Sequence, residues 1–164
     1  MPLQFLSIDN FERGIVSSLL RRSYAALVVA SDPLWRDEPA KFDAYDDEVF
    51  LNPATVGSCI FLTESDGVVV GLGSWDPRQR PAFSVVGHNC VLPEFRGRGF
   101  GKMQIQEILR RFQRQNVITA KVSTCAYPFF LPARRMYEAC GFVEMRRVSG
   151  ASGRRMVEYE KSLV

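Results

Sequence analysis

Hydrophobic residues recur with two different periods along the chain, and these periods predict its strands and helices. Apolar residues from Phe11 to Leu20 fall at helical spacing, and Asn10 stands where it can cap the first turn. We therefore expect a helix from Asn10 to about residue 30. Residues 3–7 are expected to form a short strand, and residues 31–57 an acidic, loop-like segment with room for a second short helix.

In the middle of the chain the period becomes that of extended strands. Asp66-Gly67 is a dipeptide typical of a tight hairpin turn between two strands, and Pro93 ends a later strand. The strands are expected over residues 59–64, 68–75 and 83–91.

From Gly99 the period changes to 3.6, and apolar residues such as Ile105 and Phe112 share one face. Pro132 near a first helical position and Gly141 just past the end delimit a later helix. The remaining elements are expected as a helix over 99–115, a buried strand over 117–124, and a closing hairpin of 142–148 with 154–161.

This order of elements predicts a single mixed α/β domain over residues 1–164. Meandering strands followed by a strand-helix-strand unit imply a mixed, mostly antiparallel sheet with helices on both faces. The strands 83–91 and 117–124 should run parallel, because a right-handed helical crossover joins them.

The composition is that of a globular chain. Of its 164 residues, 46% are hydrophobic and 24% charged, which excludes intrinsic disorder. No apolar stretch is long enough for a membrane span, and the first residues lack the pattern of a signal peptide, so we expect a cytoplasmic protein without membrane contact.

Residues 1–82 carry a net charge of −5 and residues 83–164 one of +8. The acidic residues of 31–57 are either solvated surface or an attraction for an amine cation.

The four cysteines do not form a metal-binding pattern. Cys59, Cys90, Cys125 and Cys140 are widely separated, and His88 is the one histidine. This spacing excludes a zinc ribbon or finger and gives no disulfide framework. We expect buried thiols and no metal.

The most informative segment runs from Arg96 to Lys102, between an expected strand and an expected helix. Its three alternating glycines allow a close approach of the backbone to a ligand. The helix that follows has no capping side chain at its start, and its first acidic residue is Glu107. Free N–H groups beside three cations, Arg96, Arg98 and Lys102, predict an anion site.

Two common phosphate-binding loops do not fit this segment. A Walker A loop needs four residues between Gly and Gly-Lys and then Ser or Thr, whereas Met103 follows Lys102. A dinucleotide fingerprint needs G-x-G-x-x-G and an acidic residue about 20 positions later, and the chain has neither.

Two stretches resemble motifs of the GNAT superfamily of acyl-CoA-dependent N-acyltransferases. The segment Val91–Lys102 is similar to its acyl-CoA motif, (Q/R)-x-x-G-x-(G/A), and Ala133–Phe142 is similar to its A-x-x-x-Y-E-x-x-G-F stretch. The resemblance covers about residues 59–160, and both motifs lie on the matching elements. It implies a GNAT-like fold in which the parallel strand pair splays apart, and acetyl-CoA as the cosubstrate.

The resemblance also implies roles for individual residues. Backbone groups of Cys90, Val91 and Leu92 would pair with the pantetheine arm. Tyr137 stands where many members donate a proton to the departing CoA thiolate. The pyrophosphate would be held by the N–H groups of Arg96, Gly97, Arg98, Gly99, Phe100, Gly101 and Lys102.

The chemistry of the side chains agrees with these roles. The ordinary pKa of tyrosine suits Tyr137 to protonating a thiolate, with core packing as its structural alternative. His88 is the candidate general base for a substrate ammonium, or else a structural histidine. The family often has Asn seven residues before the tyrosine, and here that residue is Phe130.

We expect an N-acetyltransferase that acts on a primary amine by direct transfer in a ternary complex. The acceptor is a small-molecule amine or a peptide, and a homodimer is compatible with the sequence. One alternative is an acyl-CoA sensor without turnover, which the change at Phe130 would favour. The other is a nucleic-acid-binding domain using the arginines of residues 110–114, against which the modest net charge argues, so no nucleic-acid partner is expected.

Overall fold

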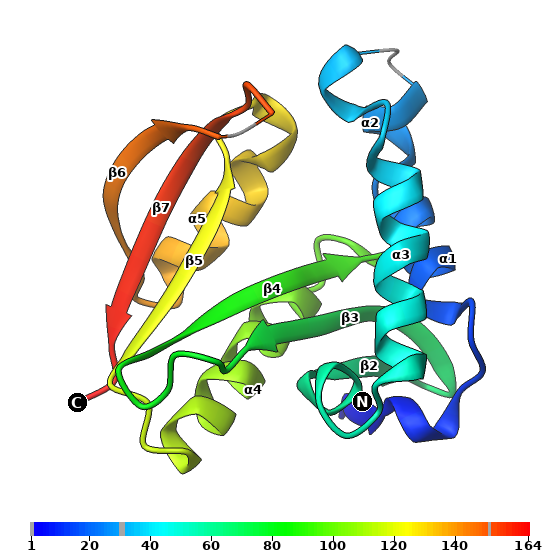
Figure 1. Ribbon diagram of the computed structural model, residues 1–164, viewed down its shortest axis with the longest axis horizontal. Coiled ribbons are helices and arrows are strands. Elements are labelled where there is room, and N and C mark those ends of the chain that lie inside the picture. Colours follow the sequence, from blue (N-terminus) through cyan, green and yellow to red (C-terminus); the bar gives the residue numbers. More distant parts are fainter. Residues whose placement is uncertain (1, 30–31, 151) are drawn as a thin grey trace. The chain divides into compact units, whose positions relative to one another are not determined.

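A computed structural model describes residues 2–29, 32–150 and 152–164 (Figure 1). The helices are α1 (Ile15–Ser23), α2 (Ala25–Val29), α3 (Glu38–Leu51), α4 (Phe100–Arg114) and α5 (Leu131–Ala139). The strands are β1 (Gln4–Ser7), β2 (Ile60–Ser65), β3 (Val68–Asp76), β4 (Phe83–Val91), β5 (Thr119–Cys125), β6 (Val143–Ser149) and β7 (Arg155–Ser162).

The strands form one seven-stranded sheet in the order β1-β2-β3-β4-β5-β7-β6. β4 and β5 run parallel, with Phe83 opposite Thr119 and Val85 opposite Lys121. The pairs β1–β2, β2–β3, β5–β7 and β6–β7 are antiparallel. The predicted mixed α/β fold, mostly antiparallel with one parallel pair, is confirmed.

Contacts within the chain divide it into two compact units. Unit 1 comprises Met1–Ser74 and His88–Gly101, and unit 2 comprises Trp75–Gly87 and Lys102–Val164. The boundary passes through β3, through β4 and through the first turn of α4.

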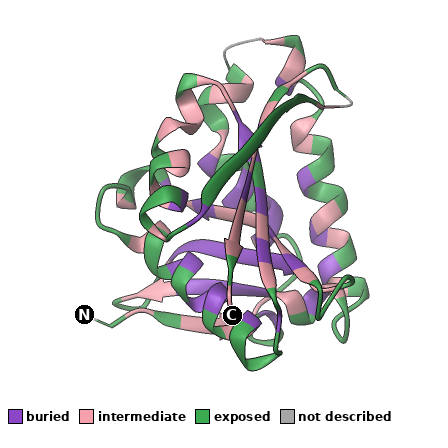
Figure 2. Ribbon diagram, turned by 90° about the vertical axis from the view of Figure 1, so that its left-hand side faces the viewer, coloured by how far each residue is buried: buried purple, intermediate pink, exposed green. Residues whose placement is uncertain are grey.

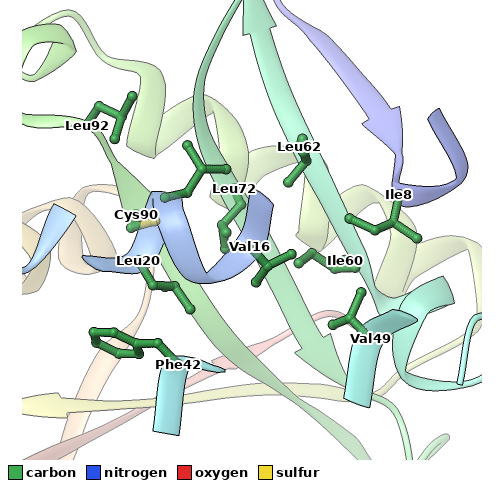
Figure 3. Packing of buried hydrophobic residues seen from close by; sticks show 11 residues of the cluster. Ile8, Val16, Leu20, Phe42, Val49, Ile60, Leu62, Leu72, Cys90 and Leu92 are labelled. Carbon is green, nitrogen blue, oxygen red and sulfur yellow. The ribbon is translucent and has the colours of Figure 1, made fainter. Parts of the chain in front are cut away.

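The core of unit 1 is built from α1, α3 and the strands β2 to β4 (Figure 3). Leu20 on α1, Phe42 on α3 and Leu72 on β3 are each almost completely removed from solvent. Apolar stripes on the two helices meet the apolar face of the strands, which is the arrangement that stabilises an amphipathic helix on a sheet. Cys90 and Leu92, at the end of β4, belong to the same cluster.

The first helix begins later than its periodicity suggests. Asn10 does not cap it, because residues 8–10 form a 3-10 turn and α1 begins at Ile15. The N-terminal N–H groups are instead capped from α3, where the buried carboxylate of Asp46 accepts hydrogen bonds from the N–H of Gly14 (2.9 Å) and of Ser17 (3.0 Å). Such a cap, from a residue about thirty positions away, leaves no local pattern in the sequence.

The acidic segment expected to be loop-like contains the fourteen-residue helix α3. Asp43 forms an ion pair with Arg21 (2.6 Å) and Asp47 forms one with Arg13 (2.5 Å), both partners lying next to or within α1. These carboxylates therefore connect α3 to α1 while remaining about half exposed to solvent. The expectation of solvated surface is wrong for the buried Asp46.

The predicted hairpin turn between β2 and β3 is confirmed. Asp66 and Gly67 both have positive φ, 51° and 78°. A two-residue turn of type I′ requires this at both central positions, which is why Asp-Gly favours it.

In unit 2, β5, β7 and β6 lie side by side and α5 packs against them (Figure 1). The ring of Tyr159 on β7 is buried against α5, whereas every residue of β6 is exposed (Figure 2). No helix of the described residues has the length and hydropathy needed to cross a membrane.

Candidate functional site

The loop after β4 takes its shape from two glycines. Residues 93–95 form one 3-10 turn, after which Gly97 and Gly99 adopt positive φ of 76° and 82°. A Cβ atom added at either glycine would meet no described atom within 4 Å. Glycine is therefore required for the backbone conformation, and the space beside the loop is open to a ligand.

The loop leads directly into α4, which begins at Phe100. The first N–H groups of a helix have no partner within the helix, and their partial positive charge favours an anion. The first turn of α4 carries no acidic side chain that could compete for this position. Loop and helix start together have the properties of an anion site.

Arg96 uses its guanidinium to hold the loop in place. Its Nε donates to the carbonyl oxygen of Val91 (3.0 Å), and its Nη2 donates to the carbonyl oxygen of Ser23 at the end of α1 (2.5 Å). A second link joins the same elements, because Arg22 of α1 forms an ion pair with Glu94 (2.9 Å). Neither link was recognisable from the sequence, since each joins residues more than seventy positions apart.

Arg98 and Lys102 are exposed, as is Arg96. The guanidinium of Arg98 lies 5.4 Å from the centre of the Phe95 ring, a cation–π distance within the loop itself. The carbonyl of Gly101, in the first turn of α4, accepts a hydrogen bond from the side-chain amide of Asn89 on β4 (3.5 Å). Asn89 was not singled out by sequence reasoning.

The backbone of Leu92, the residue that follows β4, already forms two hydrogen bonds within the protein. Its N–H donates to the carbonyl of Val70 on β3 (2.8 Å), and its carbonyl accepts from the N–H of Phe95 (2.9 Å). Because backbone groups alternate between the two edges of a strand, Cys90 points its N–H toward β3 as Leu92 does, and Val91 points its N–H toward the opposite edge.

His88 lies on β4 beneath one face of α3. The centre of its imidazole is 5.0 Å from the ring of Tyr45 and 6.3 Å from the ring of Phe42. Burial lowers the pKa of His88, while the nearby carboxylate of Glu38 acts in the opposite direction. The imidazole is consequently neutral at neutral pH, which is the form that can accept a proton.

Tyr137 lies on α5 and is only 5% exposed. Its ring packs edge-on against Phe142 (5.8 Å between centres) and at a tilt against Tyr159 (6.1 Å). Burial raises the pKa of Tyr137 well above the ordinary value for tyrosine. The expectation of an ordinary pKa is therefore wrong: the phenol stays protonated over the whole neutral range and is a weaker acid than expected.

The start of α5 differs from the pattern of an asparagine-capped helix. Phe130 occupies the N-cap position, and no side chain of the described residues caps the helix there. Its ring lies edge-on against Phe129 (5.1 Å). Phe130 thus forms an aromatic pair with Phe129 just before the helix.

The arginines of α4 are largely used within the helix. Glu107 accepts hydrogen bonds from Arg110 (2.8 Å) and from Arg111 (2.8 Å), and Arg111 also lies 5.3 Å from the ring of Trp75. These contacts reduce the cationic surface that a nucleic-acid partner would need.

The described cysteines and carboxylates form no metal site. Within residues 2–29, 32–150 and 152–164, no group of three or more His, Cys, Asp or Glu side chains could hold a metal ion. All four cysteines are free thiols. Burial raises the pKa of Cys90 to about 11, so this thiol is protonated at neutral pH.

The structure places the predicted site residues in two groups. Unit 1 brings together His88, Cys90 and the loop from Val91 to Gly101, and unit 2 contains Lys102 and Tyr137. Sequence reasoning missed the residues that hold the first group in place, because each acts over a long sequence separation. They are Ser23, Phe42, Tyr45 and Asn89.

Comparisons with known proteins agree with this geometry. Residues 20–142, about three-quarters of the chain, match the model of the Acetyltransferase (GNAT) family. No curated protein matches the chain. A GNAT-family protein from Desulfovibrio desulfuricans has a similar structure, with a TM-score of 0.75, 14% identity and 99% of both chains covered.

Two further solved structures carry ligands of interest. YncA from Salmonella typhimurium, solved with acetyl-CoA, has a TM-score of 0.69 at 15% identity and covers 100% of this chain and 94% of its own. The NatC complex bound to Gag peptide and CoA gives a TM-score of 0.69 at 15% identity, with 100% of both chains covered. At such identities these structures show a common fold. With the family model covering most of its length, this chain belongs to the GNAT family of acetyltransferases.

Proposed function

We propose that this protein is an N-acetyltransferase that moves the acetyl group of acetyl-CoA to a primary amine, by direct transfer within a ternary complex. The observation that carries the proposal is the loop before α4. Gly97 and Gly99 turn the backbone into open space, and the helix start that follows has no acidic residue in its first turn. This combination suits the pyrophosphate of CoA.

In the segment 96–102, the backbone and the side chains would have different roles in binding CoA. N–H groups of the loop and of the first turn of α4 would hold the pyrophosphate, and the exposed Arg98 and Lys102 would add attraction for phosphate. Arg96 supports the site by ordering the loop, since its guanidinium is bound to two carbonyl oxygens. The pantetheine arm would pair with the N–H of Val91, because alternation turns that group away from β3.

Two side chains would move the protons of the reaction. Neutral His88 would accept a proton from the substrate ammonium, and the freed amine nitrogen would attack the thioester carbonyl carbon. When the tetrahedral intermediate collapses, the C–S bond breaks and the thiolate takes a proton from Tyr137. The second proton of the attacking nitrogen leaves as the amide forms, and it restores the phenol of Tyr137 through water. Burial of Tyr137 keeps the phenol protonated before the transfer, and it also makes the phenol a weaker proton donor.

Direct transfer is supported by the state of Cys90, the candidate nucleophile on β4. Cys90 lies in the same segment of β4, but its thiol is buried and its pKa is raised to about 11. A protonated thiol without an adjacent base is a poor acyl acceptor. A covalent acetyl-cysteine intermediate at Cys90 is therefore not part of the proposal.

Two structural neighbours support a peptide or protein amine as the acceptor. NatC was solved with a peptide, and the ribosomal-protein-S18-alanine N-acetyltransferase of Escherichia coli, with a TM-score of 0.54 at 15% identity, is named for a protein substrate. A peptide amine is therefore proposed as one acceptor. A small-molecule amine is proposed beside it from the sequence alone, in a cytoplasmic setting.

A thiol-release assay tests the proposal. Acetyl-CoA is offered with a panel of free amines that includes peptides with an unblocked N-terminus, and each amine is matched with its N-acetylated form. Release of CoA thiol with a free amine and not with its blocked counterpart is the expected result. Tight binding of acetyl-CoA with no release for any amine would instead identify an acyl-CoA sensor.

A further inference from the structure

Three residues on one face of α3 lie over or beside His88. Glu38, Phe42 and Tyr45 are spaced by four and then three positions, so they share the same side of the helix. Phe42 presents its ring edge-on to the imidazole, and Tyr45 covers it at a tilt of 47°. The half-buried imidazole thus packs against two aromatic rings whose residues precede it by more than forty positions in the sequence.

Tyr45 is itself fixed at its far end. Its hydroxyl is hydrogen-bonded to the side chain of Ser74 on β3, and burial nevertheless raises the pKa of Tyr45 to about 12. The hydroxyl of Ser74 in turn donates to the backbone carbonyl of His88 (3.3 Å). Tyr45 is therefore connected to His88 in two ways. Its ring contacts the imidazole, and its hydroxyl is linked through Ser74 to the backbone carbonyl of the same histidine.

We propose that Tyr45 is a positioning residue for His88: its ring covers the imidazole, and its hydroxyl, through Ser74, fixes the strand that carries it. The catalytic consequence rests on the proposed function, in which His88 accepts the substrate proton. Tyr45 does not exchange a proton in this scheme. It determines where the imidazole lies and how much water reaches it.

Two titratable groups from α3 face the imidazole. The Glu38 carboxylate favours the imidazolium, and the Tyr45 phenol is uncharged up to high pH. From β3 the facing group is the hydroxyl of Ser74, which does not titrate. Removing the Tyr45 ring should therefore act through hydration of His88, while removing the Glu38 charge should act through electrostatics in the opposite direction.

A direct experiment is possible because His88 is the one histidine of the chain. Its imidazole gives a single set of NMR signals, so its titration can be followed without an activity assay. In Tyr45→Ala, water reaches the ring and the pKa of His88 should rise toward the ordinary value of about 6.5. In Glu38→Gln it should fall below that of the parent protein.

Phe50→Ala is the matched control. Phe50 is also on α3, is also partly buried and packs against the same core cluster as Tyr45, so its truncation causes a comparable loss of packing. The pKa of His88 should not change in this variant. An unchanged titration in Tyr45→Ala, or an equal rise in Phe50→Ala, would overturn the proposal.

Two more conservative variants test the proposal if Tyr45→Ala does not fold. Tyr45→Phe and Ser74→Ala each remove the bridge and keep a ring over the imidazole. Both should weaken the nuclear Overhauser contacts between ring 45 and the imidazole, because the ring is no longer held at its far end. Contacts of parental intensity in both variants would refute the bridge.

The pH dependence of kcat separates this proposal from the proposed function. If His88 is the base, the acidic limb of the profile should move with the NMR titration in Tyr45→Ala. A shifted titration with an unmoved limb would leave Tyr45 as the positioning residue of His88 and remove His88 from the reaction. A titration that does not shift contradicts the positioning role whatever the activity.

Discussion

His88 and Tyr137 occupy different parts of the fold and are both enclosed by aromatic rings. Phe42 and Tyr45 surround the imidazole in unit 1, and Phe142 and Tyr159 surround the phenol in unit 2. Burial favours the uncharged form of each, so it lowers the pKa of the histidine and raises that of the tyrosine.

The comparison shows how one physical cause can produce two opposite roles. An uncharged imidazole has a lone pair to receive a proton, and an uncharged phenol has a proton to give. Apolar surroundings therefore keep a proton acceptor available in one case and a proton donor in the other. They also make the imidazole a weaker base and the phenol a weaker acid, and the Glu38 carboxylate opposes the shift at the imidazole. The predictions below test this pairing, beginning with the cosubstrate on which both depend.

The largest effect is expected at the loop. Gly99→Asp places a side chain on a backbone with φ of 82° and a negative charge beside the expected pyrophosphate. Strain of about 1–3 kcal/mol and loss of charge-assisted hydrogen bonds should together reduce CoA affinity by roughly a hundredfold or more. Calorimetric titration measures the affinity, and the His88 NMR signal reports whether the fold is kept. A folded variant with parental affinity would remove the loop from the CoA site.

Substitution of the proposed base should have the next largest effect, with a distinctive pH dependence. His88→Gln removes the proton acceptor, and general bases contribute about 10²–10⁴ in rate. The loss of kcat at neutral pH should shrink as pH rises, because more of the amine then arrives already deprotonated. A pH–rate profile parallel to that of the parent protein would contradict the role of His88.

Substitution of Tyr137, the proposed acid, should lower kcat, and this loss should not shrink as pH rises. Tyr137→Phe keeps the ring contacts with Phe142 and Tyr159 and removes the proton donor alone. We expect kcat to fall by at least roughly tenfold, with acetyl-CoA affinity little changed, since the lost interaction develops in the transition state. Variants are compared at matched thermal stability. Unchanged turnover in a stable Phe variant would leave thiolate protonation to solvent.

The smallest effect concerns stability against pH. The pKa of His88 is lowered in the folded state, so its contribution is complete above about pH 6.5 and is lost as pH falls through the folded value. The pKa of Tyr137 is raised, so its contribution is complete below about pH 10 and is lost as pH rises. Thermal melts of His88→Gln should show a flatter acid side, and those of Tyr137→Phe a flatter alkaline side. Identical slopes in parent and variant would contradict the pKa shift concerned.

The elements that the sequence predicted well are those specified by neighbouring residues. The bounds of β4 agree with the expectation, and Asp66-Gly67 forms the predicted turn because both residues tolerate positive φ. The glycine loop was likewise recognisable from Gly97 and Gly99, since its conformation depends on the residues that adopt it.

The features that the sequence could not reveal depend on distant partners. Periodicity placed the start of α1 at Asn10, whereas the helix is capped by Asp46 from α3. Arg96 was expected to attract phosphate with its side chain. The structure shows a further contact that the sequence did not predict, because the guanidinium binds the carbonyl oxygen of Ser23, seventy-three positions earlier. The contact between Tyr45 and His88 could not be predicted for the same reason, because no local sequence pattern indicates which helix will cover a given strand.

Product analysis tests the central claim most directly. The parent protein is incubated with acetyl-CoA carrying an isotope in the acetyl group, together with the amine that gives most thiol release, and the products are identified by mass spectrometry. Labelled acetyl on the amine nitrogen, in equal amount to free CoA and greatly reduced in Gly99→Asp, is the predicted result. Bound acetyl-CoA that yields neither acetylated amine nor free CoA with any amine of the panel would contradict the assignment as an N-acetyltransferase.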